Sequence, residues 1–324
     1  MDDSPIQTAL CVIGHPIGGN PTQFVALRAL AALGLDWQFM SFDVDPSRVD
    51  SAIAGIDSLG FCGAMIAAPY QMRVAEILAQ VRGGVDADRR EAAWHDCLHR
   101  DAAGQLRACN VLAESMQSLI GTHAQSTGLQ LERCLWVGEE SHRASQTQPF
   151  LPILPETKWL IAGTNVVAWP VAATSGSLQQ AATELPTAEQ ASTEIAAIAA
   201  SPVAEEAADH TPAADVESAP ALVLWDIETR PTKKAVAKAA PLAPSPLLIA
   251  DLLTRLHPAS LLIDLAGTFE AWNAVRIEAG EPSLAVISQM ELEVMRLGLA
   301  LQHWTGSKPN LDLMREAIEE YLVI

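Results

Sequence analysis

Residues 8–34 read TALCVIGHPIGGNPTQFVALRALAALG, and this stretch holds the pattern that decides the fold. The apolar run 8–14 ends at a glycine, as a buried parallel strand does, and residues 24–34 repeat apolar side chains at helical spacing. Gly34 stands where the end of a helix favours glycine. The stretch therefore predicts a strand, a loop rich in glycine and proline, and a helix.

Two more strands and one more helix follow in the same rhythm. Residues 37–44 (WQFMSFDV) and 64–69 (AMIAAP) are short apolar runs typical of strands, and residues 48–60 (RVDSAIAGIDSLG) have helical spacing. Strand, helix, strand, helix, strand is the order of a parallel α/β sheet. We therefore predict an N-terminal parallel-sheet domain over residues 1–130.

A second unit of the same kind begins with KWLIAGTNVVAWPVAA at residues 158–173. Residues 222–227 (LVLWDI) and 260–267 (SLLIDLAG) are apolar runs that predict later strands of its sheet. The pattern predicts a Rossmann-like domain over residues 131–285.

The C-terminal segment, residues 286–324, predicts two helices. Gly306 and Pro309 interrupt the helical pattern between them. We expect both helices to pack back on the first domain, which completes a two-domain α/β protein.

Residues 173–220 differ from the rest of the chain in composition. They consist mostly of Ala, Thr, Glu, Ser and Pro and contain neither Lys nor Arg. Few large apolar residues are present to offset the entropy cost of ordering. The segment therefore predicts a largely disordered acidic insertion; recruitment of a basic partner by this segment is the alternative.

The charge and the cysteines restrict the partners and the compartment. A net charge of -19 and a pI near 4.7 repel nucleic acid and anionic lipid. The N-terminus MDDSPIQTALCVIGHP lacks the basic region of a signal peptide, and the sequence has no run of about 18 apolar residues. The five cysteines are scattered without a C-x-x-C pair. We expect a cytoplasmic protein that binds neither nucleic acid nor membrane.

One pair of histidines has the spacing of metal ligands. His95 and His99 are four positions apart in WHDCLH, a segment that we expect to be helical. The segment lacks the glutamate of the H-E-x-x-H motif, and an ordinary surface helix explains the spacing. We predict no metal site.

The N-terminal loop and helix resemble the opening of shikimate dehydrogenases, which have a G-N-P-I-x-H-S-x-S-P turn and a helix ending in L-G-L-D. Here GHPI begins at Gly14, and LGLD ends at Asp36 without a gap in spacing. On this frame the two serines that hold the substrate carboxylate fall on Asn20 and Thr22. Both residues can still donate hydrogen bonds.

Residues 60–71, GFCGAMIAAPYQ, resemble the family's G-x-x-G-x-N-V-T-I-P-H-K, with both glycines and the proline kept. The substrate-contacting Asn and Thr of that motif fall on Met65 and Ala67. Its catalytic Lys falls on Gln71.

Three further segments extend the resemblance. LRACNV (106–111) is similar to G-A-V-N-T, so the substrate-binding Asn falls on Asn110. GTHAQSTG (121–128) is similar to G-x-N-T-D-x-x-G, so the catalytic Asp falls on Gln125. The substrate-contacting Gln of the C-terminal helix pair falls on Arg296.

The resemblance implies NADP as the cofactor, if the chain binds one. A dinucleotide turn has G-x-G-x-x-G or A after a strand, and the candidate is GTNVVA, which keeps Gly163 and Ala168. Asn165 places a Cβ where close approach to the pyrophosphate requires none. After the next strand, Asp226 would serve a ribose hydroxyl and Arg230 a 2′-phosphate.

The family's activity is NADP-dependent oxidoreduction in the shikimate pathway of aromatic amino acid biosynthesis. A glutamine at position 71 or 125 has no proton to exchange near neutral pH, and loss of acid–base catalysis costs about 10²- to 10⁴-fold in rate. We therefore predict a divergent member that is impaired in shikimate/3-dehydroshikimate oxidoreduction, a pseudoenzyme that keeps a cleft for a small molecule such as a cyclic carboxylate.

Two alternatives stay open. The chain could be an active shikimate- or quinate-type NAD(P)-dependent dehydrogenase in which His15, His123 or Tyr70 replaces the lost groups. It could instead be a non-catalytic scaffold that acts through its acidic insertion.

Overall fold

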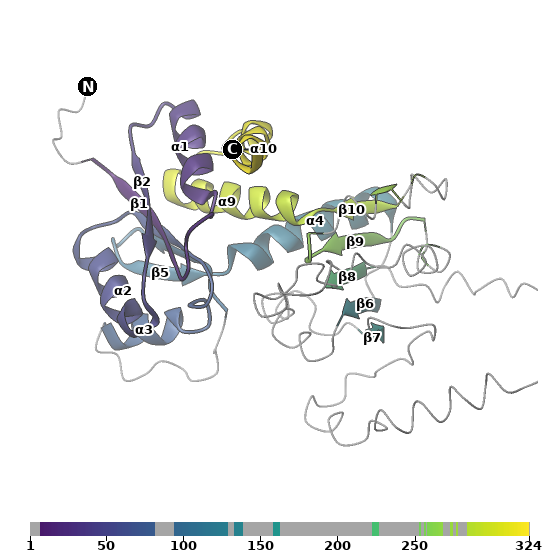
Figure 1. Cartoon of the computed structure of the whole chain (residues 1–324), viewed down its shortest axis with the longest axis horizontal. Coiled ribbons are helices and arrows are strands. Elements are labelled where there is room, and N and C mark those ends of the chain that lie inside the picture. The colour runs from purple at the N-terminus through teal and green to yellow at the C-terminus, as the bar shows by residue number, and fades with distance from the viewer. Residues whose placement is uncertain are drawn as a thin grey trace, which may run out of the picture.

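The computed structural model describes 7–81, 94–128, 133–138, 158–162, 222–226 and, between 253 and 323, residues 253, 256, 258–267, 273–274, 277 and 284–323. The acidic segment 173–220 lies outside the described residues. The described part forms two five-stranded sheets, with α4 (Val111–Thr127) running from the first sheet to the second (Figure 1).

The first sheet has the strand order β2-β1-β3-β4-β5. Its strands are β1 (Ala9–Gly14), β2 (Gln38–Asp43), β3 (Gly63–Ile66), β4 (Cys97–Arg100) and β5 (Leu106–Cys109). Its helices are α1 (Thr22–Ala32), the 3₁₀ turn η1 (Pro46–Arg48), α2 (Val49–Ser58) and α3 (Val74–Val81). The predicted strand–helix order of residues 8–69 is confirmed.

This sheet is mixed rather than wholly parallel. β2, β1 and β3 are parallel, whereas β4 runs antiparallel to both β3 and β5. β4 and β5 form a hairpin whose turn contains Gly104 with a φ of 75°. The expectation of a helix at WHDCLH is therefore wrong: His99 lies within β4, and His95 precedes the strand.

The second sheet is parallel throughout, in the order β10-β9-β8-β6-β7. Its strands are β6 (Arg133–Gly138), β7 (Lys158–Ala162), β8 (Leu222–Asp226), β9 (Leu261–Asp264) and β10 (Ala285–Ile287). The predicted strands at 222–227 and 260–267 are confirmed. The expectation that the unit opens at residue 158 is wrong, because β6 precedes β7 and lies inside the sheet.

The two C-terminal helices, α9 (Gln289–Thr305) and α10 (Leu311–Val323), pack against the first sheet and α1 (Figure 1). Their buried residues share one core with β1 and α1. That core contains Leu10, Val12, Val25, Ala29, Leu30, Val294, Leu297, Leu301, Met314 and Ile318.

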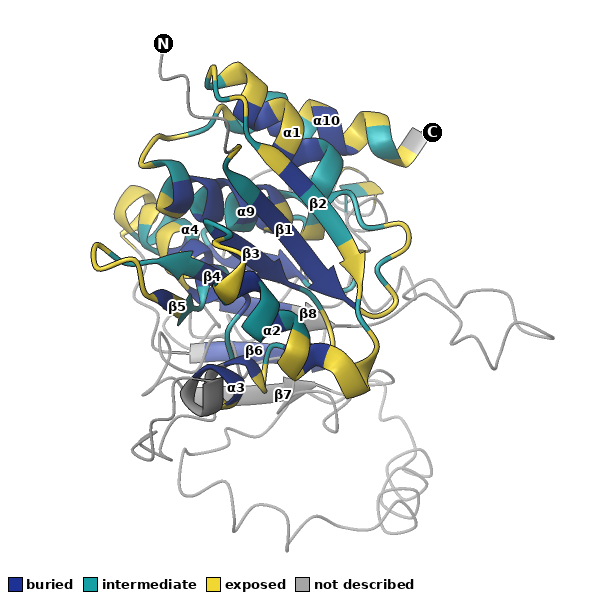
Figure 2. Cartoon of the chain, turned by 90° about the vertical axis from the view of Figure 1, so that its left-hand side faces the viewer, coloured by how far each residue is buried: buried dark blue, intermediate teal, exposed yellow. Residues whose placement is uncertain are grey.

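Burial follows this layering. β1 and β3 are buried along their lengths between the covering helices, while exposed residues gather on the outer faces of α1 and α2 (Figure 2). Within the described residues, none of the helices is both long and apolar enough to span a membrane.

Candidate functional site

The carboxyl ends of the parallel strands β1, β2 and β3 meet at one edge of the first sheet, where α/β proteins bind ligands. The loops after β1 and β3 are in contact, because the backbone N–H of His15 donates to the carbonyl of Ala68 at 3.0 Å. A Cβ at Gly14 would lie 2.8 Å from the Cβ of Ala67, so only glycine fits there. This edge holds the candidate site.

The end of β3 offers little chemistry. Met65 is 3 % exposed and belongs to the core, and Ala67 packs against the loop after β1. Tyr70 is buried, its hydroxyl donates to the carbonyl of Val44, and burial raises its pKa. Gln71 is half-buried, and its backbone carbonyl accepts from the backbone N–H of His95 at 3.0 Å, which leaves its side-chain amide outside this bond. The strand end therefore presents a neutral amide.

The loop after β1 and the first residue of α1 hold two polar side chains that could contact a ligand. Asn20 Oδ1 accepts from the backbone N–H of Thr22 at 2.9 Å, which orders the start of α1. Within the described part of the chain, neither the Asn20 amide nitrogen nor the Thr22 hydroxyl has a hydrogen-bond partner. Both half-buried side chains therefore remain able to hold a ligand.

The structure separates Asn110 from Gln125. Asn110 precedes α4, and its side-chain oxygen accepts from the backbone N–H of Ala113 at 2.8 Å. Gln125 lies 15 positions later, about 22 Å along the helix axis, and is exposed. GTHAQSTG continues α4 up to the left-handed Gly128, so it forms no turn at the strand end. Gln125 is not placed beside Gln71, contrary to the expectation.

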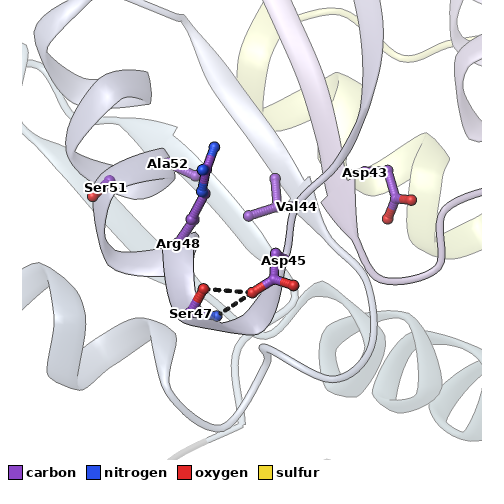
Figure 3. Close-up of a pocket in the computed structure, with 7 residues that line it drawn as sticks. All are labelled: Asp43, Val44, Asp45, Ser47, Arg48, Ser51 and Ala52. Carbon is purple, nitrogen blue, oxygen red and sulfur yellow. Dashed lines mark hydrogen bonds between the residues drawn. The ribbon is translucent and has the colours of Figure 1, made fainter.

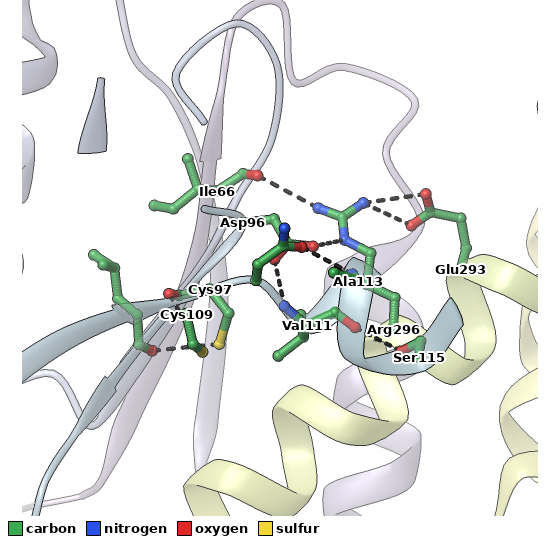
Figure 4. Close-up of polar contacts among 11 residues, drawn as sticks. Ile66, Asp96, Cys97, Cys109, Val111, Ala113, Ser115, Glu293 and Arg296 are labelled. Carbon is green, nitrogen blue, oxygen red and sulfur yellow. Dashed lines mark hydrogen bonds and ion pairs between the residues drawn. The ribbon is translucent and has the colours of Figure 1, made fainter. Parts of the chain in front are cut away.

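Arg296 is held by protein groups on all three guanidinium nitrogens (Figure 4). Nε donates to Asp96 Oδ2 at 2.5 Å, one terminal nitrogen donates to both Glu293 oxygens at 3.0 and 3.1 Å, and the other contacts the Ile66 carbonyl at 3.4 Å. The side chains of Arg296 and Asp96 are 12 % and 0 % exposed. Arg296 therefore caps the end of β3, rather than offering a free cation to a ligand as expected.

The sequence pattern does not predict the ion pair between Asp96 and Arg296. Burial raises the pKa of Asp96 to about 6, although the neighbouring Arg296 opposes the rise. The pKa of Arg296 is raised above its ordinary range by Glu293 and Asp96, against the effect of burial. A lone aspartate before a strand gave no signal, since its partner is 200 residues away.

Of the three substitute catalytic groups, only His15 keeps a suitable partner at the strand ends. Its Nδ1 lies 2.9 Å from Asp43 Oδ1. His123 contacts the carbonyl of Ala259 at 2.7 Å and so ties α4 to the second domain. Tyr70 is committed to the Val44 carbonyl.

A cavity of about 600 Å³ lies beside Asp43 (Figure 3). Its lining comes from the end of β2, η1 and α2: Asp43, Val44, Asp45, Ser47, Arg48, Ser51 and Ala52. Hydrogen bonds from Ser47 lower the pKa of Asp45. The lining combines polar and apolar side chains and carries charges of both signs.

A family model described as the shikimate dehydrogenase substrate binding domain matches residues 12–92. Residues 12–92 of this chain are thus similar to the substrate-binding domain of shikimate dehydrogenases. It is 29 % identical over 123 residues to the shikimate dehydrogenase (NADP(+)) of Anaeromyxobacter dehalogenans strain 2CP-1, which covers 36 % of this chain and 43 % of that protein. The corresponding enzyme of Geobacter metallireducens is 30 % identical over 122 residues, covering 36 % and 42 %. The matches thus span less than half of each relative.

Solved structures extend the fold likeness over nearly the whole chain. Shikimate 5-dehydrogenase of Thermus thermophilus, crystallised with NADP(H) and shikimate, has a TM-score of 0.54 at 15 % identity and covers 97 % of this chain and 100 % of that one. Ligand-free 5-ketofructose reductase of Gluconobacter sp. strain CHM43 has a TM-score of 0.57 at 14 % identity, covering 97 % and 99 %. The two-domain α/β fold of the shikimate dehydrogenase family is confirmed.

The residues that follow β6 in the sequence bear on whether the second domain could hold a dinucleotide. The first strand of a doubly wound sheet carries the glycine-rich pyrophosphate turn, and here that strand is β6. β6 ends at Gly138, which Glu139 and Glu140 follow in the sequence. Asp226 pairs with Gly138 in the parallel register, so it adds a third acidic residue. This acidic sequence does not fit a pyrophosphate.

The turn proposed for NADP follows β7, which lies at the edge of the described sheet, rather than β6, which lies inside it. Gly163, Asn165, Ala168 and Arg230 themselves lie outside the described residues, and Asp226 is the last residue of β8. The dinucleotide turn after β7 therefore stays a prediction.

Proposed function

We propose that this chain is a divergent shikimate dehydrogenase-like protein, impaired in NADP-linked shikimate/3-dehydroshikimate oxidoreduction, that retains a small-molecule cleft. One observation carries the proposal. From Gly63 to Gln71 the only titratable side chain is Tyr70, and its hydroxyl is bonded to the Val44 carbonyl. The strand end that would hold the catalytic Lys therefore has no group ready to exchange a proton.

The retained cleft is supported by the polar groups around that strand end. The Asn20 amide, the Thr22 hydroxyl and the Gln71 amide can hydrogen-bond a ligand, whereas the charge of Arg296 is already neutralised by Asp96 and Glu293. A cyclic, hydroxylated carboxylate fits neutral donors of this kind. The acidic sequence after β6 supports the loss of NADP-linked turnover, because carboxylates repel a pyrophosphate.

We propose that the chain has three parts: a substrate-binding domain at 1–130, a Rossmann-like domain at 131–285 and C-terminal helices at 286–324. We place the protein in the cytoplasm on the basis of its five scattered cysteines, all of which are free.

Ligand binding and turnover test the proposal together. We expect shikimate or quinate to raise the Tm, NADP and NAD to leave it unchanged, and NADPH formation from shikimate to stay at the level of an enzyme-free blank. Thr22→Val should abolish the shift with shikimate, while Thr122→Val, on the exposed surface of α4, should preserve it. Enzyme-dependent NADPH formation would overturn the loss of activity, and a full shift in Thr22→Val would overturn the cleft.

His15 and Asp43 favour one second candidate, an active NAD(P)-dependent dehydrogenase with a substitute base. A histidine 2.9 Å from a carboxylate is the arrangement of a general base and the group that orients it. If turnover is found, His15→Gln should lower it by about 10²- to 10⁴-fold, and Asp43→Asn should lower it less.

A further inference from the structure

A second cluster of reactive side chains lies away from the strand ends, on the face of the β4–β5 hairpin that α9 covers. Cys97 and His99 are two positions apart in β4, so their side chains lie on the same face of the strand. Cys109 is the cross-strand partner of Cys97. Trp304 of α9 donates its indole N–H to the Leu98 carbonyl at 2.8 Å, which fixes the helix on the hairpin. Potential metal ligands gather at the edge of this contact.

Cys109, Glu114 and His303 bring three different ligand atoms together. The Cys109 sulfur, a Glu114 carboxylate oxygen and a His303 ring nitrogen all lie within 4.8 Å of one another. They come from the end of β5, the first turn of α4 and the last turn of α9. His303 Nε2 is already 3.1 Å from Glu114 Oε2.

The position of His303 is fixed from a second side. Its ring stacks on that of His99, with 5.4 Å between the ring centroids and 28° between their planes. This stacking limits the rotation of His303 and holds its Nε2 toward Glu114. The imidazole is therefore partly oriented before any ion binds.

We propose that Cys109, Glu114 and His303 form a binding site for a zinc ion. A thiolate, an imidazole and a carboxylate are the ligands that zinc takes in proteins, at bond lengths of about 2.0–2.3 Å. In a tetrahedral site such bonds place neighbouring ligand atoms about 3.3–3.6 Å apart. The ligand atoms therefore have to move closer to one another by about 1.5 Å at most. The side chains of Glu114 and His303, which are 44 % and 32 % exposed, have room for this movement.

The set leaves a fourth coordination position open. Binding requires the Cys109 thiol to lose its proton, so one proton is released to solvent as the zinc–sulfur bond forms. The ion would join α4 to α9 and β5, and zinc should therefore raise the Tm of the whole chain.

The test uses the full chain after dialysis against a chelator. Calorimetric titration with zinc chloride should give one site per chain, and cobalt(II) should give the near-ultraviolet thiolate-to-cobalt charge-transfer band. Cys109→Ser should abolish the band. His303→Ala and Glu114→Gln should each weaken zinc binding by at least about 10- to 100-fold.

Matched variants separate this site from adventitious binding. Cys62→Ser removes another partly buried thiol, and Glu319→Gln removes an exposed carboxylate on α10; both should bind zinc as the wild type does. Zinc binding that is equally strong in His303→Ala and Glu114→Gln, or no binding at all in the wild type, would overturn the proposal. Because Glu114 and His303 are partly exposed, we expect His303→Ala and Glu114→Gln to fold. These two variants test the site even if Cys109→Ser does not fold.

Discussion

Asp96 is a fully buried carboxylate that joins several elements of the described structure. Its side chain has no exposed surface, and it accepts hydrogen bonds from Arg296 and from the backbone N–H of Val111 at the start of α4. Its own backbone N–H donates to the Cys109 carbonyl. Removing one partner of such a buried pair leaves an uncompensated charge, which typically costs about 3–5 kcal/mol. Asp96 therefore fixes a helix start, a hairpin and α9 at one point.

The raised pKa of Asp96 predicts a specific pH dependence of stability. Its folded pKa is about 6 and its ordinary value is 3.8, so between these pH values the folded state binds the proton more tightly than the unfolded state. The contribution of Asp96 therefore stabilises the fold below pH 3.8 and is lost as the pH rises through 6. The loss is about 3 kcal/mol.

Urea unfolding at several pH values from 4 to 7 measures this loss. We expect the free energy of unfolding of the wild type to fall by about 3 kcal/mol relative to Asp96→Asn over that range. Asp312→Asn, which removes a carboxylate that is 84 % exposed, should follow the wild type. Parallel pH curves for wild type and Asp96→Asn would contradict the prediction.

At the scale of elements, the docking of α9 on the first sheet depends on a glycine. A Cβ at Gly63 would overlap Trp304 Nε1 and the Leu98 carbonyl oxygen, which are the two partners of the indole hydrogen bond. β3, β4 and α9 can therefore meet only because residue 63 has no side chain.

Substitution of Gly63 should weaken the packing of α9 against β3 and β4. We expect Gly63→Ala to lower the free energy of unfolding by about 1–3 kcal/mol, because Trp304 or the backbone of β4 must shift. Gly55→Ala, inside α2 with no atom within 4 Å of the new Cβ, should instead stabilise the protein by up to about 1 kcal/mol. Chemical unfolding of the two variants distinguishes these effects. If Gly63→Ala and Gly55→Ala had the same free energy of unfolding, the packing of α9 would not depend on Gly63.

The elements themselves were largely predictable, because apolar periodicity reports each strand and helix locally. The order of strands in the second sheet was not predictable, since β6 and β7 have similar composition and only their pairing shows that β6 lies between β7 and β8. The four residues of β4 are too few to show the period of a strand. Of the candidate site, Asn20 and Gln71 lie on the loops after β1 and β3, as the sequence predicts, and Thr22 is the first residue of α1. The position of Gln125 and the Asp96–Arg296 pair depend on contacts between distant segments, which the sequence does not show.

At the scale of the whole molecule, the acidic segment 173–220 lies between β7 and β8 in the sequence. β7 ends at Ala162 and β8 begins at Leu222, so both strands lie outside the acidic segment. Its composition predicts that it contributes little burial. We expect that replacing 173–220 with a short Gly/Ser linker leaves the Tm within a few degrees of the wild type. A large fall in Tm, measured by differential scanning calorimetry, would contradict the prediction of a disordered insertion.

The return of α9 and α10 to the first sheet also has a consequence for synthesis on the ribosome. Val25, Ala29 and Leu30 of α1 share a core with residues of α9 and α10, and Arg28 pairs with Glu320, 292 positions later. A nascent chain that has emerged as far as α4 still lacks α9 and α10, which cover α1 and the first sheet. The apolar surface that these two helices bury therefore remains exposed while the second domain is made. The first domain is therefore the last to be completed, although its strands are the first to be translated.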